Sequence, residues 1–378
     1  RMTFRSDGDG YLPTGNQQVF FVPAEGGTPR QMTSGKYPVS TSITWMPDSE
    51  SIIFASNRSD KPEYSPRQSD LYSVSLATGV LTQLTDQAGA EGNPAVSPDG
   101  RFLAYAATAG IRKGYNGAEL VIKDFKTGET RTLTDTLDRS IADIQWSDNS
   151  KRIWIGYDDL GVGRVAEVDL NGKLRKAEIV IGGTAIGRPY TSGAFSVAGD
   201  ARLAFTQGRD DRPADIAVFR PGKAPLQLTD LNSDLMGQRQ MARVERLVWP
   251  SSHDELMIEG WVMKPPGFDP SRQYPMILEI HGGPHAAYGP NYSTEAQLYA
   301  AAGYVVFYTN PRGSTSYGDT FANEIDLAYP GYDYDDLMSG VDALIEKGFV
   351  DPTQLFVTGG SGGGVLTAWI VGKIRAIY

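Results

Sequence analysis

The sequence predicts a two-part protein, with a β-propeller over residues 1–240 and a parallel α/β sheet over residues 241–378. A repeat of about 50 residues in the first part indicates propeller blades. An alternation of strands and helices in the second part indicates parallel strands with right-handed crossovers. A serine between glycines, directly after one of these strands, indicates a nucleophile at the end of the sheet.

The composition excludes several classes of protein. The chain has 378 residues, of which 40% are hydrophobic, so it can form a packed interior and more than one domain. It contains no Cys, which excludes disulfides, thiolate metal sites and a cysteine nucleophile. A net charge of −10 argues against a nucleic-acid partner, and no apolar run is long enough for a membrane helix. Cytoplasmic, periplasmic and secreted locations stay open, and a homo-oligomer is compatible with these features.

Two short markers repeat along residues 1–240. In the first, a turn containing Asp precedes a short apolar strand, and each Asp is predicted to cap its own turn rather than bind a ligand. These turns lie at Trp45–Asp48, Ser97–Gly100, Trp146–Asn149 and Ser196–Asp200. The second marker is a polar residue, an apolar residue and Thr, at Gln31–Thr33, Gln83–Thr85, Thr132–Thr134 and Gln227–Thr229.

A period of about 50 residues with several short strands in each repeat is typical of four-stranded propeller blades. The alternative is a β-sandwich in which the turn spacing is a coincidence. Residues 1–240 hold fewer than five such blades, which is near the low end of the usual range of about 4–8. An open ring of so few blades is not expected to be stable, so we expect that N-terminal blades lie outside the sequence, and a first residue of Arg1 instead of Met agrees with this.

The second part has a different pattern of elements. Two paired strands are predicted at 244–249 and 256–263, followed by buried strands at 276–280, 304–308 and 355–358. Helices are predicted at 293–302, with Ser293 as the N-cap, and at 333–347. Three carboxylates at the start of the second helix are expected to interact with its dipole rather than take part in catalysis; they are Asp333, Asp335 and Asp336.

Ser361 is the predicted nucleophile. It lies in Gly359–Gly363, a G-x-S-x-G sequence between a buried strand and an apolar helix. A tight turn at this point would force the serine into a strained conformation and hold its hydroxyl above the sheet, at a helix N-terminus that favours negative charge. The alternatives are a phosphate loop, which lacks a Lys at the required spacing, and a plain tight turn.

Two backbone amides are candidates for stabilising an oxyanion. One belongs to Gly362, directly after the serine, and the other is expected in the Gly-rich turn His281–His285, which follows an earlier strand. A zinc site made by the two His of this turn is disfavoured, because the Gly-Gly-Pro sequence between them prevents a helix. His281 could instead act as a general base, but a structural role, with its imidazole hydrogen-bonded to nearby backbone, is the better interpretation.

Three motifs in this order, behind a propeller, resemble the prolyl oligopeptidase family of serine peptidases. They are His281–His285, Asn310–Gly318 and Gly359–Gly363. The acylaminoacyl-peptidase and dipeptidyl-peptidase-like branch is the most similar. The resemblance implies an α/β-hydrolase domain capped by a propeller of about seven blades. It also implies cleavage of short peptides, because a propeller restricts the access of folded proteins.

The resemblance implies a role for each matching residue. Ser361 is the nucleophile, and the N–H groups of Gly283 and Gly362 form the oxyanion hole. Arg312 lies near the rim of the active site, where family members use this segment structurally or for substrate contact. Neither a metal nor an organic cofactor is required. The family usually has Tyr at the position of Gly362, so the subsite preference does not carry over.

The largest departure from the family concerns the rest of the catalytic triad. In α/β-hydrolases Asp and His follow the serine, but neither occurs after Ser361 in this sequence. We expect both to lie outside residues 1–378, and we expect this polypeptide alone to be inactive. Two other functions stay open at this stage: an esterase-type hydrolase on the same scaffold, and a catalytically inactive propeller that binds a partner.

Overall fold

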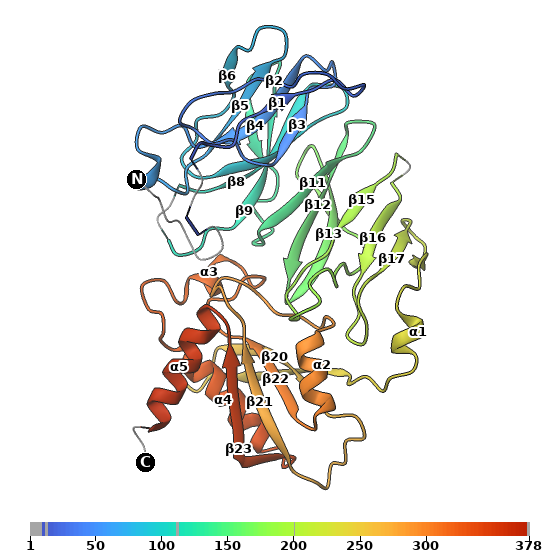
Figure 1. The fold of residues 1–378 in the computed structure, drawn as a ribbon, viewed down its shortest axis with the longest axis vertical. Helices are drawn as coiled ribbons and strands as arrows, with labels where there is room; N and C mark the ends of the chain where they lie inside the picture. Colours follow the sequence, from blue (N-terminus) through green and yellow to red (C-terminus); the bar gives the residue numbers. More distant parts are fainter. Residues whose placement is uncertain (1–9, 12–13, 111–112, 200, 376–378) are drawn as a thin grey trace. The chain divides into compact units, whose positions relative to one another are not determined.

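The computed structural model describes residues 10–11, 14–110, 113–199 and 201–375 (Figure 1). The chain divides into two compact units, formed by residues 1–110 with 120–131, and by residues 111–119 with 132–378. The domain boundary at residue 240 stays a prediction. The compact units divide elsewhere, because two blades lie in the same unit as the C-terminal sheet that contains parallel strands.

The first unit consists mainly of short antiparallel strands. It contains a two-stranded sheet, β1 (Phe20–Phe21) with β2 (Arg30–Gln31), and a short 3₁₀ helix, η1 (Pro62–Tyr64). A four-stranded sheet follows in the order β3 (Ile43–Trp45), β4 (Ser51–Ser56), β5 (Asp70–Ser75), β6 (Leu81–Gln83). Most of the next sheet also belongs here, in the order β10 (Thr130–Thr132), β9 (Ala118–Asp124), β8 (Phe102–Thr108), β7 (Glu91–Val96).

The second unit begins with two further four-stranded sheets of the same pattern. One has the order β11 (Ile141–Trp146), β12 (Arg152–Asp159), β13 (Val162–Asp169), β14 (Leu174–Lys176). The other has the order β15 (Phe195–Val197), β16 (Leu203–Gln207), β17 (Asp215–Phe219), β18 (Leu226–Gln227). Four successive four-stranded sheets at this spacing confirm the predicted blades.

The Asp-containing turns join the first and second strands of each blade. Asp48 and Asp99 each accept a hydrogen bond from the backbone N–H two residues later, as predicted. In the third blade the neighbouring Asn149 accepts this bond in place of Asp148. Asp200, in the fourth turn, lies outside the described residues. The repeated Asp is therefore mainly a turn-forming residue.

The second marker has a structural reason that the sequence did not reveal. The Thr85 hydroxyl accepts a hydrogen bond from the buried N–H of Leu71, at 2.8 Å, and the amide of Gln83 donates to the Thr85 carbonyl at 2.9 Å. Thr33 and Thr229 accept equivalent bonds from backbone N–H groups that lie 14 and 13 residues earlier in the chain. Each threonine thus satisfies an N–H group that the strand ladder leaves unpaired.

The C-terminal region of the second unit is a mixed five-stranded sheet. Its order is β19 (Val244–Pro250), β20 (Met257–Met263), β22 (Val305–Asn310), β21 (Tyr274–Ile280), β23 (Val350–Gly359). The strands β22, β21 and β23 are parallel to one another, whereas β19 and β20 are antiparallel, as the sequence predicted. Between these strands lie α2 (Thr294–Ala301), α3 (Asp319–Asn323) and α4 (Asp333–Ile345), while α1 (Ser233–Met236) precedes the sheet and α5 (Gly362–Arg375) follows it.

Helices cover both faces of this sheet (Figure 1). On one face, strand residues pack against α4 and α5 around Leu337, Val341 and Leu366. On the other face, Ala296 and Ala300 of α2 pack against the strands. The Ser293 hydroxyl accepts a hydrogen bond from the Ala296 N–H at 3.1 Å, which confirms the predicted N-cap.

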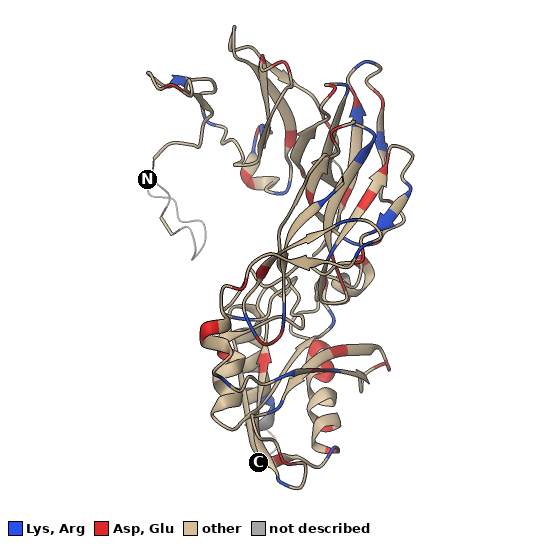
Figure 2. Cartoon of the chain, turned by 90° about the vertical axis from the view of Figure 1, so that its right-hand side faces the viewer, with Lys and Arg blue, Asp and Glu red and all other residues tan. Residues whose placement is uncertain are grey.

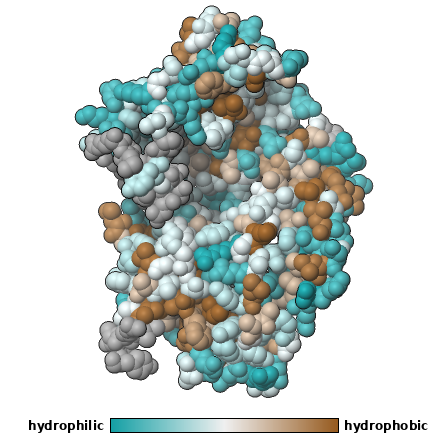
Figure 3. Space-filling view, in the orientation of Figure 1, coloured by the Kyte–Doolittle hydropathy of each residue, from teal (hydrophilic) through white to brown (hydrophobic). Residues whose placement is uncertain are grey.

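An apolar surface lies beside β23, which pairs with β21 on one side only. Its exposed large side chains come from β23 and α5, and Figure 3 shows apolar atoms gathered in this region; they are Leu355, Phe356, Val365, Trp369 and Val371. None of the helices in the described ranges is long and apolar enough to span a membrane.

Charges of both signs are interspersed along the blade strands, as Figure 2 shows. Several opposite charges meet on neighbouring strands. Arg152 of β12 pairs with Glu167 of β13, and Arg139 bonds to Asp159 at 2.9 Å. Such half-exposed pairs contribute about 0–1 kcal/mol each, so the blades depend mainly on their apolar cores.

The threonine marker can be tested at Thr85. Thr85→Val keeps the shape of the side chain but leaves the buried N–H of Leu71 without an acceptor. We expect the free energy of unfolding to fall by about 1–3 kcal/mol. Thr82→Val, at an exposed position of β6, is the matched control for chemical denaturation. Equal stability of the two variants would contradict this role of the marker.

Candidate active site

Ser361 lies in a tight turn between β23 and α5. Its φ angle is 55°, in the left-handed region that residues other than glycine rarely adopt, and its side chain is exposed. The neighbouring glycines make the turn possible. A Cβ on Gly363 would lie 2.1 Å from the carbonyl oxygen of Ile280, and a Cβ on Gly359 would lie 2.6 Å from the Gly363 backbone. The strained conformation expected from the sequence is therefore present.

Two unpaired backbone donors lie beside this turn. Among the described residues, neither the Gly283 N–H nor the Gly362 N–H has a hydrogen-bond acceptor. The Gly283 nitrogen is 3.3 Å from the position that a Cβ on Gly362 would occupy. Tyr329 holds the start of α5, since its hydroxyl donates to the Gly362 carbonyl at 2.5 Å. The two donors can therefore approach one oxygen atom near Ser361.

None of the three His of the chain is placed as a base for this serine. His281 is buried, with Nδ1 2.9 Å from the Gly282 carbonyl and Nε2 2.9 Å from the Ser314 hydroxyl. Nδ1 of His285 lies 3.0 Å from the Gly313 carbonyl, and His253 stacks on Tyr332. These contacts favour the structural role predicted for His281.

Arg312 is buried in a network of ion pairs. Its guanidinium donates to both carboxylate oxygens of Asp336, at 3.0 and 2.9 Å, and to both oxygens of Asp254, at 3.0 and 2.9 Å. Only 2% of the side chain is exposed. Substrate contact by Arg312 stays a prediction, but this geometry favours the structural alternative for the residue.

The carboxylates at the start of α4 have different roles. Asp333 accepts hydrogen bonds from the backbone N–H groups of Gly331 and Tyr334, which agrees with a role at the helix N-terminus. For Asp336 the prediction was incomplete, because its main partner is the Arg312 side chain. Hydrogen bonds from Arg312 also lower the pKa of Asp254, the second partner in the network.

The segment between β14 and β15 also reaches the serine turn, and sequence reasoning missed it. Arg188 bonds to Glu295 at 2.8 Å and lies 3.2 Å from buried Glu279, and its Nη1 is 3.0 Å from the position of a Cβ on Gly360. Burial raises the pKa of Glu279, whereas the bond from Arg188 lowers the pKa of Glu295. No motif marks this segment, because it lies more than 160 residues before Ser361 in the sequence.

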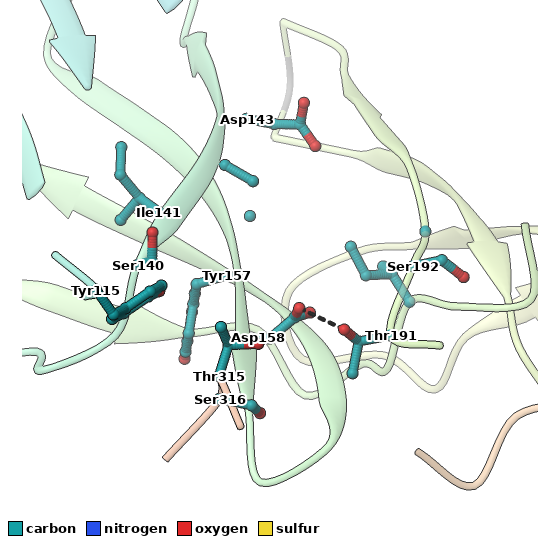
Figure 4. A pocket seen from close by; sticks show the side chains of 14 residues that line it. Tyr115, Ser140, Ile141, Asp143, Tyr157, Asp158, Thr191, Ser192, Thr315 and Ser316 are labelled. Carbon is teal, nitrogen blue, oxygen red and sulfur yellow. Dashed lines mark hydrogen bonds between the residues drawn. The ribbon is translucent and has the colours of Figure 1, made fainter. Parts of the chain in front are cut away.

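A pocket of about 310 Å³ lies next to this segment (Figure 4). The Thr191 hydroxyl donates to the Asp158 carboxylate at 2.6 Å, and burial raises the pKa of Asp158. The other polar side chains of the lining include Tyr115, Ser140, Asp143, Ser192 and Ser316. Two carboxylates, those of Asp143 and Asp158, therefore line a pocket of mixed polar and apolar character.

Comparison with known proteins identifies the family. Residues 290–378 match the prolyl oligopeptidase family, and residues 11–210 match the TolB beta propeller domain. An uncharacterized peptidase of Bacillus subtilis, YuxL, is 32% identical over 94% of this chain and 67% of its own length. The chain belongs to the prolyl oligopeptidase family. The resemblance inferred from the three motifs is thus confirmed.

One further sequence relative and one solved structure are also similar to this chain. Dipeptidyl-peptidase 5 of Porphyromonas gingivalis is 27% identical over 96% of the chain and 52% of its own length. The solved acylaminoacyl peptidase of Pyrococcus horikoshii has a TM-score of 0.75 at 21% identity, over 97% of this chain and 58% of that one. The chain thus spans 67% of the Bacillus peptidase and about half of the dipeptidyl peptidase. The predicted fold, a β-propeller followed by an α/β-hydrolase region, is confirmed.

The structural role of Arg312 predicts a large loss of stability on substitution. Arg312→Met leaves Asp336, which is fully buried, without its positive partner. We expect the free energy of unfolding to fall by about 3–5 kcal/mol. Arg220→Met, at an exposed position, is the control in denaturation experiments, and a similar small effect of both variants would contradict the assignment.

Burial lowers the pKa of His281 to about 4 from its ordinary value of 6.5. The unfolded chain therefore binds the proton more readily, so this histidine stabilises the fold above pH 6.5 and loses that contribution as the pH falls toward 4. Between pH 7 and pH 4.5 the loss is on the order of 2 kcal/mol. We expect His281→Gln to lose less stability than the parent over this interval in denaturant titrations, and an identical loss would contradict the assignment.

Proposed function

We propose that the protein containing this chain is a serine peptidase that hydrolyses short peptides through an acyl-enzyme on Ser361. The observation that carries the proposal is the exposed hydroxyl of Ser361, held in a left-handed turn beside two backbone N–H groups that have no acceptor in the described part of the chain. This arrangement suits acyl transfer, since a nucleophile and oxyanion donors converge on one point. The names of the relatives, which include peptidases and dipeptidyl peptidases, support the same chemistry.

In the proposed reaction the Ser361 oxygen attacks the carbonyl carbon of the substrate, and its proton passes to a general base. The Gly283 and Gly362 N–H groups donate to the oxygen that becomes negative. The C–N bond then breaks, the amine leaves with the proton, and water hydrolyses the acyl-enzyme. No step requires a metal or an organic cofactor.

The general base is proposed to come from the rest of the full-length protein. The three His of this chain are engaged elsewhere, by backbone carbonyls, the Ser314 hydroxyl or the ring of Tyr332. The curated relatives are longer than this chain, which leaves room for the His and Asp of the triad. Ser361 without such a base would be a weak nucleophile.

The substrate is proposed to be a short peptide with either an acylated or a free amino terminus. The two modes correspond to acylaminoacyl-peptidase-like and dipeptidyl-peptidase-like activity. They can be separated by offering one peptide reporter with an acylated amino-terminal residue and another with a free amino-terminal dipeptide. Mass spectrometry of the released fragment identifies the mode, and matched ester reporters test for an esterase.

The role of Ser361 is tested by covalent labelling. We expect an organophosphonate to label the full-length protein at Ser361. Ser361→Ala should remove the label and lower the rate of peptide hydrolysis by at least about 10³-fold. Ser252→Ala, in the exposed turn between β19 and β20, is the control and should keep both. Labelling of the Ser361→Ala protein at the level of the parent would exclude Ser361 as the nucleophile.

A further inference from the structure

The cavity of Figure 4 lies at a bulge in the third blade. Strands β11 and β12 change register between Ile141 and Ile144. As a result, Ala142 and Asp143 of β11 lie opposite the single residue Gly156 of β12. A bulge of this kind re-aims the side chains of its strand. Gly156 has no side chain to fill the space, and a Cβ on it would lie 3.4 Å from Oδ2 of Asp143.

A second carboxylate lies across the cavity from Asp143. It belongs to Asp158 of β12, and Figure 4 shows the two side chains on opposite sides of the open space. The carboxylate of Asp158 accepts the hydrogen bond from the Thr191 hydroxyl, and no other hydrogen bond from a described residue reaches it. Burial raises the pKa of this carboxyl, and the bond from Thr191 offsets the rise only in part.

Neither carboxylate has a positively charged partner in the described part of the chain. Asp143 forms no hydrogen bond or ion pair there, and none of the described residues that line the cavity is Lys, Arg or His. The next residue along β12, Asp159, contrasts with them, because it pairs with Arg139 and Lys176. A cation that enters the cavity therefore meets two negative charges that the described residues leave uncompensated.

The rest of the lining suits a cation that carries several N–H groups. Tyr115 and Tyr157 contribute aromatic rings, whose faces attract guanidinium and ammonium groups. The side chain of Tyr157 is only 3% exposed, and its hydroxyl has no hydrogen-bond partner among the described residues. A guanidinium combines a flat face with five N–H donors, which matches a site made of carboxylates, a free hydroxyl and aromatic rings. The volume of about 310 Å³ is in the range of small-ligand sites.

The cavity adjoins the loop that carries the proposed oxyanion donor, Gly283. The N–H of Thr315, a lining residue, donates to the carbonyl of Ala286 at 3.0 Å. The ring of Tyr115 lies against that of His285, with the centroids 5.4 Å apart. The lining residues and the serine turn belong to the same compact unit. A peptide bound at the serine can therefore extend over this loop and place a side chain in the cavity.

We propose that this cavity binds the basic side chain of an Arg or Lys residue in the peptide substrate, with Asp143 and Asp158 as the partners of its charge. The inference rests on the proposed peptidase function and adds a substrate class to it, namely short peptides with a basic residue close to the cleaved bond. Arg fits better than Lys, because a guanidinium bonds to a carboxylate through two N–H groups and also stacks on an aromatic ring.

The first test is kinetic and uses the full-length protein. A single Arg is moved along a short peptide, from two residues before the cleaved bond to two residues after it. Each peptide has a partner in which citrulline, which is neutral and has nearly the same shape, replaces Arg. Both series are made with free and with acylated amino termini. At one position we expect kcat/KM to be about 10- to 100-fold higher with Arg than with citrulline, mostly through KM.

Two variants assign this preference to the cavity. Asp158→Asn keeps an oxygen for the Thr191 hydroxyl but removes the charge, and Asp143→Asn removes the charge on the opposite side. We expect each variant to lower the ratio of kcat/KM between the Arg and citrulline peptides by at least about fivefold. Asp230→Asn, at an exposed position outside the cavity, is the control and should keep the ratio of the parent. A ratio near one at every position, or a ratio that neither cavity variant changes, would overturn the inference.

The second test measures binding without hydrolysis, by calorimetry on full-length Ser361→Ala protein. We expect the Arg peptide to bind more tightly than the citrulline peptide, and the difference to disappear when Asp158→Asn is added. Equal affinity for the two peptides would overturn the inference. If acylation of the amino terminus lowers the affinity while Arg and citrulline bind equally, the cavity holds the amino terminus and the proposal of a side-chain site is wrong.

Failure of this inference is distinct from failure of the proposed function. If the parent protein hydrolyses peptides regardless of their charge and Ser361→Ala does not, the peptidase proposal holds and the cavity proposal fails. If Ser361→Ala is as active as the parent, the proposed nucleophile is wrong, whereas calorimetry still reports whether the cavity distinguishes Arg from citrulline.

Discussion

The turn at Ser361 depends on the absence of side chains at its neighbours. The start of α5 lies so close to β21 that a Cβ on Gly363 would meet the Ile280 carbonyl at 2.1 Å, and Gly359 is similarly confined. Only glycine tolerates this approach of helix to strand. The close packing accompanies a left-handed conformation of Ser361, whose side chain is exposed, and the N–H of Gly362 directly after it has no acceptor among the described residues. The proposed nucleophile and one proposed oxyanion donor therefore depend on one backbone constraint.

A buried charge network supports the region around this turn. Arg312 connects its own segment, which follows β22, to the start of α4 through Asp336 and to the β19–β20 turn through Asp254. Because Asp336 is fully buried, its charge is tolerated only with this partner. The segment that contains Arg312 is thereby fixed, and with it the Ser314 hydroxyl that contacts His281.

Propeller sequence and hydrolase sequence meet within the second compact unit. Arg188 and Tyr190 belong to the connection between two blades, yet they lie beside Gly360 and Gly282 of the serine site. The backbone of this connection bonds repeatedly to residues 287–295. Residues that connect two blades therefore contribute to the region around Ser361.

The sequence by itself determined the features that depend on local spacing. The blade repeat, the parallel strands, the Ser293 cap and the glycine-flanked serine all follow from turn chemistry and periodicity, which act over a few residues. The tertiary structure decided what depends on contacts between distant segments. It placed Arg312 with Asp336 and Asp254, and it brought the Tyr190 hydroxyl within hydrogen-bond distance of Gly282, 92 residues later in the chain. Such pairings leave no pattern in the sequence, because they arise only when packed elements bring the partners together.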